Sequence, residues 1–298
     1  MKKIKFFVVF LLLIRTAAFA QTEGDFTVTL TRDNTGAIIT KYNGSVTAVS
    51  IPATIQGMPV REIGEQAFAR NSNITNIIIP EGVTSINSND YILGAFAGCV
   101  KLVSVALPAS LVRIGNRAFI NCSALQEIII PEGVTVIGEG AFAGCRSLKI
   151  VTLPISLKRI GRYAFSYEYQ NLVVPNIDKN SAPIFSSITL PVGLEEINDY
   201  AFMGSRTLTS IVLPDSVTTI APGVFANCTA LESVTLPSTI SRIGSAAFQG
   251  CTALSVITIP DSVEEIIFSS DGASFKGNDK LTLASQAALR RRGYTGKF

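Results

Sequence analysis

Few side chains in this sequence are of the kinds that enzymes use. The chain has no histidine, which removes His-based triads, imidazole metal ligands and the commonest general base. Two carboxylate pairs, Glu195-Glu196 and Glu264-Glu265, could act as a glycosidase does only if the two groups faced each other across a cleft. Adjacent strand residues point to opposite faces, so we interpret both pairs as solvated surface charge. No GxGxxG or GxxxxGK phosphate loop occurs. We therefore expect no enzymatic activity and no cofactor.

Five cysteines occupy one repeated position: Cys99, Cys122, Cys145, Cys228 and Cys251. In stacked coils their Cα atoms would lie about 5 Å apart, close enough for disulfides, and an exported protein could oxidise them. In-register side chains, however, run parallel and do not point toward each other. A metal site is disfavoured because no histidine or acidic group accompanies the column. We favour buried, unpaired thiols and expect all five to be alkylated after unfolding without reductant.

The first twenty residues have the parts of a secretory signal peptide. Lys2, Lys3 and Lys5 precede an apolar run over 6–14, and Ala18-Phe19-Ala20 forms a cleavage site before Gln21. Nine apolar residues are about half of the roughly 20 that a membrane-spanning helix needs. We expect an exported chain with no transmembrane segment in its mature part.

Net charge does not favour a polyanionic partner. The whole chain carries +3, but the signal peptide holds four of the 25 basic residues and none of the 22 acidic ones. The mature chain therefore carries 21 basic and 22 acidic residues, a net charge of −1. This balance argues against nucleic-acid binding.

A repeat organises nearly the whole sequence. Most steps between successive apolar-triplet prolines are 23 residues, and every unit but one places such a proline 12 residues after a phenylalanine. The prolines are at 52, 80, 108, 131, 154, 191, 214, 237 and 260, and the phenylalanines at 68, 96, 119, 142, 165, 202, 225, 248 and 275. A fixed period of this length indicates a solenoid.

Residues 119–142 show how one coil is built. Leu125, Ile128 and Ile130 alternate as in a strand that Pro131 ends, because proline cannot donate to a ladder. Gly138 recurs in sister units as glycine or asparagine, which favours a left-handed turn there. The EGAF stretch that follows predicts a tight helical turn that drives the phenylalanine inward.

Stacking would bury these groups in ladders whose ends need caps. Residues 25–52 predict an opening hairpin, FTVTLT and AIITKY about Asp33-Asn34-Thr35-Gly36, and residues 284–292 predict a closing helix stopped by Gly293. Within the stack we expect Phe142→Ala to cost about 3 to 5 kcal/mol. We expect Phe275→Ala to cost less, because a neighbour would be missing beside the cap.

The unit Leu125-x-x-Ile128-x-Ile130-Pro131, followed by Val134-x-x-Ile137-Gly138-x-x-Ala141-Phe142-x-Gly144-Cys145, strongly resembles the BspA-like leucine-rich repeats of bacterial surface proteins. The resemblance covers residues 46–283. It implies a right-handed, β-rich leucine-rich-repeat solenoid of 23-residue coils with short helical or 3-10 turns. It also implies an exported, adhesin-like protein that contacts host or neighbouring-cell proteins, with extracellular-matrix proteins as the usual ligands.

We divide the chain into a signal peptide (1–20), an N-terminal capping hairpin and first strand (21–52), a solenoid (53–283) with an insertion near 166–186, and a C-terminal cap and tail (284–298).

The predicted long strands form one continuous sheet whose outward third position carries no charge. It is occupied by Ser50, Ile78, Ala106, Ile129, Thr152, Thr189, Val212, Thr235 and Thr258. Such a surface suits extended contact with a protein. The alternative is that threonine and valine stand there only because they favour strands. We take Ile129, Thr152, Thr189, Val212 and Thr235 as candidate ligand-binding residues.

The unit after Phe165 has 26 residues before its proline, so it carries an insertion. Tyr167 and Tyr169 begin it, and basic residues lie near it: Arg146, Lys149, Lys158, Arg159 and Arg162. Tyrosine with arginine is a common hot-spot composition. We interpret Tyr167, Tyr169, Lys149, Arg159 and Arg162 as a secondary contact site for an acidic protein or glycan, with a passive loop as the alternative.

Two functions of different classes remain. The first is a surface adhesin or receptor-like module that binds a protein ligand. The second is a structural or assembly protein of the periplasm or outer envelope. The anchoring device and the oligomeric state are left open by the sequence.

Overall fold

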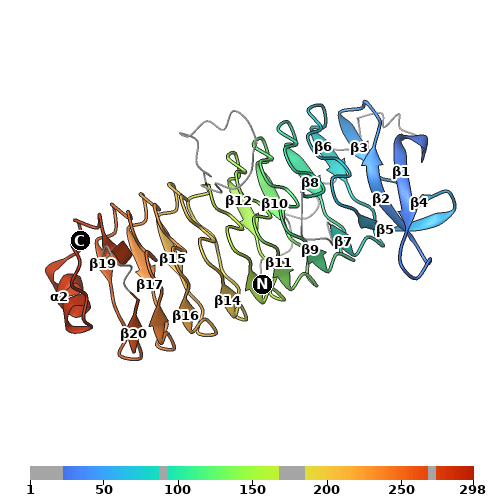
Figure 1. The fold of residues 1–298 in the computed structure, drawn as a ribbon. Helices are drawn as coiled ribbons and strands as arrows, with labels where there is room; N and C mark the ends of the chain where they lie inside the picture. The colour runs from blue at the N-terminus through green and yellow to red at the C-terminus, as the bar shows by residue number, and fades with distance from the viewer. Residues whose placement is uncertain (1–22, 87–92, 168–184, 268–272) are drawn as a thin grey trace, which may run out of the picture.

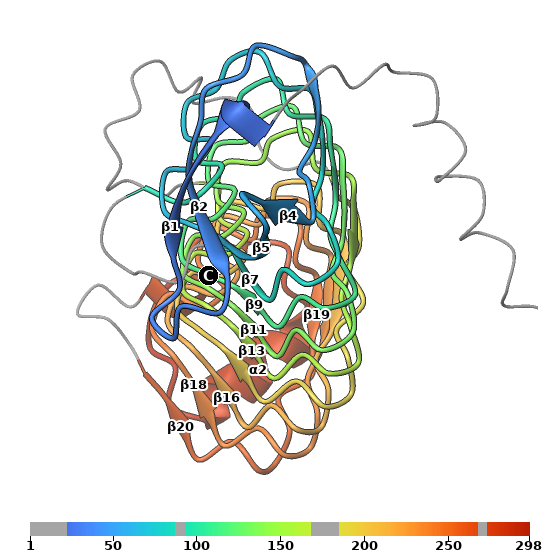
Figure 2. The ribbon, with the colours of Figure 1, turned by 90° about the vertical axis from the view of Figure 1, so that its right-hand side faces the viewer.

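The computed structural model describes residues 23–86, 93–167, 185–267 and 273–298. The predicted signal peptide lies outside these residues. Within them the chain forms a stack of coils that runs from an N-terminal hairpin to a C-terminal helix (Figure 1). Seen along the stack, each coil is offset from the one before it (Figure 2). The predicted β-rich solenoid is confirmed.

A first ladder of parallel strands follows one side of the stack (Figure 1). We call this set of strands the first ladder. In each unit the proline follows an apolar residue, and the strand ends one or two residues before that apolar residue. Its strands are β3 (Ala48–Ser50), β6 (Asn76–Ile78), β8 (Ser104–Ala106), β10 (Glu127–Ile129), β12 (Ile150–Thr152), β15 (Ser210–Val212), β17 (Ser233–Thr235) and β19 (Val256–Ile257).

The first ladder is not the continuous sheet that the sequence predicted. It consists of three separate sheets, β3-β6-β8, β10-β12 and β15-β17-β19. Residues 187–189 take no strand conformation, so Thr189 lies in a break between β12 and β15. The break falls in the coil that carries the insertion, where the chain between Phe165 and Pro191 departs from the repeat.

The more continuous sheet forms from the second apolar pair of each unit, and we call it the second ladder. Its strands are β5 (Met58–Ile63), β7 (Ser85–Ile86), β9 (Arg113–Ile114), β11 (Val136–Ile137), β13 (Arg159–Ile160), β14 (Glu196–Ile197), β16 (Thr219–Ile220), β18 (Arg242–Ile243) and β20 (Glu265–Ile266). One sheet runs from the N-terminal hairpin to β14, and β16-β18-β20 form another.

The inward phenylalanines lie on turns that join every coil to the next. Ala141, Ala143 and Cys145 donate backbone bonds to the third residue before them, which is the 3-10 pattern that the EGAF stretch predicted. The Phe142 amide meanwhile donates to the Ala164 carbonyl of the following coil at 2.8 Å. The corresponding bond from Phe165 to Ala201 spans the insertion coil, so this connection continues where the first ladder breaks.

The predicted left-handed turn is not the reason for glycine at the Gly138 position. Gly138, Gly161 and Gly244 are absent from the residues with positive φ, which fall two residues later, as at Gly140. A Cβ on Gly138 would instead lie 2.5 Å from the backbone carbon of Gly115 in the preceding coil. Glycine is required here because the two backbones approach too closely for any side chain.

The N-terminal cap is the predicted hairpin. Strand β1 (Phe26–Leu30) pairs antiparallel with β2 (Ala37–Tyr42), after the 3-10 turn η1 (Glu23–Asp25). Strand β2 then pairs in parallel with β5, so the hairpin covers the open edge of the second ladder. A second hairpin, which the sequence analysis did not predict, joins β4 (Thr54–Ile55) to β5 through Gln56 and Gly57, both at positive φ.

At the other end, the turn η2 (Ala273–Phe275) leads to helix α2 (Leu283–Arg291), which ends before Gly293 at φ 88°. Tyr294 then packs edge-on against Phe275, with ring centroids 5.6 Å apart, and Phe275 is fully buried. The expectation that Phe275 lacks a neighbour on one side is therefore wrong.

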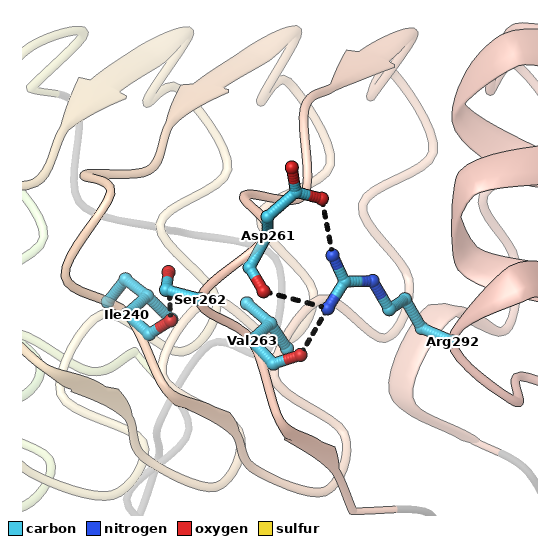
Figure 3. Close-up of polar contacts among 5 residues, drawn as sticks. All are labelled: Ile240, Asp261, Ser262, Val263 and Arg292. Carbon is cyan, nitrogen blue, oxygen red and sulfur yellow. Dashed lines mark hydrogen bonds and ion pairs between the residues drawn. The ribbon is translucent and has the colours of Figure 1, made fainter.

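Arg292 completes this cap. Its guanidinium donates the hydrogen bond that a serine or threonine hydroxyl of the next coil donates elsewhere in the stack. Within the stack, Ser262 donates to the Ile240 carbonyl at 2.7 Å, and Thr239 donates to the Val217 carbonyl. Behind Ser262 no further coil follows, and the Arg292 guanidinium donates to the carbonyl groups of Val263 and Asp261 and to the Asp261 carboxylate (Figure 3). The last coil thus keeps its acceptors satisfied.

Candidate functional site

The outward face of the first ladder carries the candidate residues as exposed side chains. Ile129 is 49% exposed and Val212 is 64% exposed, and Thr152, Thr189 and Thr235 are also exposed. Ile128 and Ile211, between outward positions, are buried, as strand alternation requires. Thr189 lies on this face but in the break between strands, so it does not share the regular spacing of the others.

The sequence prediction covered only the third position of each strand triplet, so it did not include two further exposed residues of this face. Ile150 and Val256, at the first position, are 54% and 50% exposed. First and third residues of a three-residue strand point to the same face, so this signal was present in the alternation itself. Among the strands of the first ladder, the outward positions hold a single charged residue, Glu127. The face is therefore weakly polar with exposed apolar groups.

The basic residues near the insertion do not form one cationic patch. Lys149 is exposed beside β12. Arg159 forms an ion pair with Glu196 at 2.9 Å, and Lys158 forms one with Glu195 at 2.9 Å. These pairs join neighbouring coils of the second ladder and neutralise two of the predicted basic groups. Both glutamate side chains are more than half exposed, which agrees with the interpretation of Glu195-Glu196 as surface charge.

Tyr167 is a packed residue of the coil and not part of a protruding loop. Its side chain is 8% exposed, and its amide donates to the Met203 carbonyl at 2.9 Å. The guanidinium groups of Arg146 and Arg206 lie 5.8 and 5.2 Å from its ring centroid. The regular coil therefore extends through residue 167 and is regular again from Phe185, whose side chain is buried. Tyr169 lies outside the described residues.

Arg162 belongs to a different cluster, which the sequence analysis did not identify. It lies over the ring of Tyr163, 4.9 Å from the centroid, and Tyr163 stacks on Tyr200 with centroids 5.0 Å apart and planes 8° from parallel. Burial raises the pKa of the Tyr163 hydroxyl. The two tyrosines occupy the position that Gly140 and Gly223 hold in other coils, and that substitution was the available signal.

A groove of about 320 Å³ lies next to this cluster. Its lining comes from four successive coils: Asn116, Val136, Ile137, Gly138, Glu139, Arg159, Gly161, Arg162, Asn198 and Asp199. The groove has amide, carboxylate and guanidinium groups on its walls, and the backbone of the glycine column contributes to its floor. Two candidate residues of the basic group, Arg159 and Arg162, line this hollow together.

The five cysteines are buried and free. Each thiol lies within hydrogen-bond distance of the phenylalanine carbonyl of the preceding coil, as Cys145 does to Phe119 at 3.2 Å and Cys251 to Phe225 at 3.1 Å. Burial raises the pKa of Cys145 and of Cys228 to about 12. At neutral pH these groups are therefore protonated donors with little nucleophilic character.

In the described part of the chain, no group of three or more Cys, Asp or Glu side chains is arranged to hold a metal ion. Over the same residues, no helix has the length and apolar character needed to cross a bilayer.

Comparison with known proteins agrees with this architecture. The chain is similar to the T. pallidum leucine-rich-repeat protein TpLRR, whose crystal structure is known. The two sequences are 27% identical, the match covers 93% of this chain and 98% of that chain, and the TM-score is 0.58. A leucine-rich-repeat protein from Bacteroides ovatus is 24% identical, with 95% and 99% covered and a TM-score of 0.44. A leucine-rich cell surface protein from Faecalibacterium prausnitzii is 25% identical, with 95% and 100% covered and a TM-score of 0.40. No curated protein matches the chain.

The family model for the BspA type leucine rich repeat region matches residues 40–173 and 179–282, in six copies. These residues include both ladders, the phenylalanine turns and the groove. Repeat proteins of this family typically act by binding other proteins. The chain belongs to the BspA-type leucine-rich-repeat family.

Proposed function

We propose that this chain is an exported, adhesin-like protein that binds another protein through the outward face of the first ladder. The observation that carries the proposal is the run of exposed apolar and threonine side chains on that face, with Ile129, Ile150 and Val212 each about half exposed or more. A broad β surface with few charges loses little solvation energy when a protein covers it. Exposed apolar groups of this kind commonly mark interaction sites.

The ligand that the family resemblance favours is an extracellular-matrix or neighbouring-cell protein. A structural or assembly role in the periplasm or outer envelope is the second candidate. Treatment of intact cells with protease separates the two, because surface-exposed protein is digested and periplasmic protein is spared. Loss of the chain from intact cells supports the adhesin-like role, and full protection supports the envelope role.

The binding surface can be tested with purified matrix proteins in a surface plasmon resonance panel. Thr152→Glu with Val212→Glu places two charges in the middle of the face, and Thr219→Glu on β16 is the matched control on the second ladder. All three positions are exposed, so the fold should be kept. We expect the double variant to weaken binding at least tenfold and the control to leave it unchanged. Equal affinity of the double variant and the parent would remove this face as the site.

A further inference from the structure

The groove between the second ladder and the phenylalanine turns has a polar side chain at the same position of four successive coils. One wall carries Asn116, Glu139, Arg162 and Asp199, each three residues before the inward phenylalanine of its own coil. Coils stack at about 4.8 Å, so the four groups extend over about 14 Å. Asn198 stands where the three preceding coils have Gly115, Gly138 and Gly161, and it is the lining residue from the last coil of the groove. The hollow is therefore a short trough with a defined end.

The charges of this trough are balanced within the protein. Arg159 pairs with Glu196, and Arg117 pairs with Glu139 at 3.4 Å. Arg162 and Asp199 add one charge of each sign to the same wall. A trough with both donors and acceptors and little net charge has no preference for an anion or a cation. It suits a neutral ligand whose groups can both donate and accept hydrogen bonds.

Two of its polar groups have capacity to spare. Among the described residues, neither the Asn198 amide nor the Asp199 carboxylate makes a side-chain hydrogen bond to the protein, and both line the trough. The Asn116 carboxamide oxygen is occupied by the Glu139 amide at 2.7 Å, which holds that part of the wall in place. Polar groups that are held in place and have unfilled hydrogen-bonding capacity can fix the orientation of a ligand.

The tyrosines beside the trough are kept at an energetic cost. Tyr163 and Tyr200 have φ of 55° and 58°, a region that bulky residues rarely adopt. Gly140 and Gly223 avoid the strain in their coils, whereas Gln66, Arg117 and Ala246 adopt the same positive φ, and strain of this kind costs on the order of 1–3 kcal/mol per residue. The two rings stack, and both are partly exposed next to Arg162. Aromatic rings beside hydroxyl-binding groups are suited to sugars, whose C–H faces pack on rings while their hydroxyls both donate and accept.

We propose that this trough binds a neutral, linear glycan of three or more sugar units. The pyranose units of an extended chain repeat at a distance similar to the coil spacing, so successive sugars would each meet one polar side chain from successive coils. This site is separate from the protein-binding face of the first ladder and does not depend on it.

The test uses cellohexaose, maltohexaose and chitohexaose as probes, with the chain comprising residues 21–298. Binding is measured by isothermal titration calorimetry, and contact by saturation-transfer NMR. We expect at least one hexasaccharide to bind, and Arg162→Ala with Asp199→Ala to weaken it about tenfold or more, which corresponds to the loss of about 1.4 kcal/mol. Asp215→Ala, an exposed carboxylate outside the trough, is the matched control and should bind as the parent does.

Tyr163→Gly tests whether a loss of sugar binding could come from misfolding. Glycine relieves the positive φ, so the thermal midpoint should not fall, while sugar binding should weaken because the ring is gone. Thr152→Glu with Val212→Glu should leave sugar binding intact, which separates this proposal from the protein-binding one. Failure of all three sugars to bind, or binding that survives the trough substitutions, would overturn it. The proposal would also be overturned if no sugar bound and the trough variants reduced binding of a protein ligand, because the trough would then be part of the protein-binding site.

Discussion

At the scale of single residues, the cysteines show how the repeat controls chemical reactivity. Each thiol is buried next to the carbonyl group of a phenylalanine one coil earlier, which gives its hydrogen an acceptor. The Cys122 and Cys99 side chains also interact with each other, and both thiols are free. Ser205 occupies the same buried position in the coil of Phe202, but its hydroxyl has no hydrogen-bond partner among the described residues, so the position accepts a small polar side chain even without that bond.

This arrangement predicts that the native thiols are inert. At pH 8 we expect no cysteine of the folded protein to react with iodoacetamide, because a pKa of about 12 at Cys145 and Cys228 leaves almost no thiolate. After unfolding in guanidinium without reductant, all five should be alkylated. Mass spectrometry counts the labels in each state. A cross-linked peptide joining Cys122 to Cys145, or fewer than five labels after unfolding, would show that the column oxidises.

At the scale of elements, the repeat itself was predictable and its local causes were less so. The inward phenylalanines, the hairpin at 26–42 and the closing helix follow from spacing and turn residues, which act within one coil. The role of Gly138 did not follow, because a left-handed turn and a close backbone contact both select glycine. Only the distance to the neighbouring coil separates the two causes, and that distance is a property of the stack.

The candidate site was predictable to the same extent. Alternation along the strands placed Ile129 and Val212 on the outward face correctly. Tyr167 was assigned to an insertion because the sequence does not show where the regular coil ends. The pairing of Arg159 with Glu196 was hidden, since the partners are separated by the insertion and meet only as neighbours in the second ladder.

The C-terminal cap gives the element-scale prediction. Arg292→Ala removes the donor that satisfies the Val263 and Asp261 carbonyls, and hydrogen bonds to charged groups contribute about 1.5–3 kcal/mol. We expect a loss of about 1–3 kcal/mol in the free energy of unfolding, and faster amide exchange in β20 and α2. The Asp261 ion pair adds little to this, because its carboxylate is fully exposed.

Arg291→Ala is the matched control, because Arg291 is exposed and lies on the same last turn of α2. It should change neither the stability nor the exchange pattern. Identical behaviour of the two variants would mean that Arg292 does not act as the final coil's hydrogen-bond donor.

At the scale of the whole molecule, the coils are held together by connections that differ in continuity. The first ladder breaks between β8 and β10 and again at the insertion coil, and the second ladder ends one sheet at β14 and begins another at β16. The phenylalanine column does not break: Phe165 stacks on Phe142 at 5.5 Å and on Phe202 at 5.6 Å. The aromatic column and its backbone bonds therefore join the two halves of the solenoid where both sheets are interrupted.

The last prediction compares the middle of this column with its end. Phe142 lies between Phe119 at 5.4 Å and Phe165 at 5.5 Å, while Phe275 lies between Phe248 at 5.4 Å and Tyr294 at 5.6 Å. Both rings are almost completely buried with aromatic neighbours on two sides, so each substitution to alanine should leave a similar cavity. We expect each to cost about 3 to 5 kcal/mol in guanidinium titrations.

Phe298→Ala is the control for a phenylalanine at the margin of the column. Phe298 is partly exposed and packs on Tyr294 at 5.0 Å, so its loss should cost clearly less than either core substitution. A solenoid is stabilised by contacts between neighbouring coils. If the C-terminal cap stays packed on the last coil, the stability of that coil should depend on its phenylalanine ring as much as the stability of a central coil does. A Phe275→Ala cost no larger than that of Phe298→Ala would mean that Tyr294 and α2 fray from the stack, and that the C-terminal coil is an open end in solution.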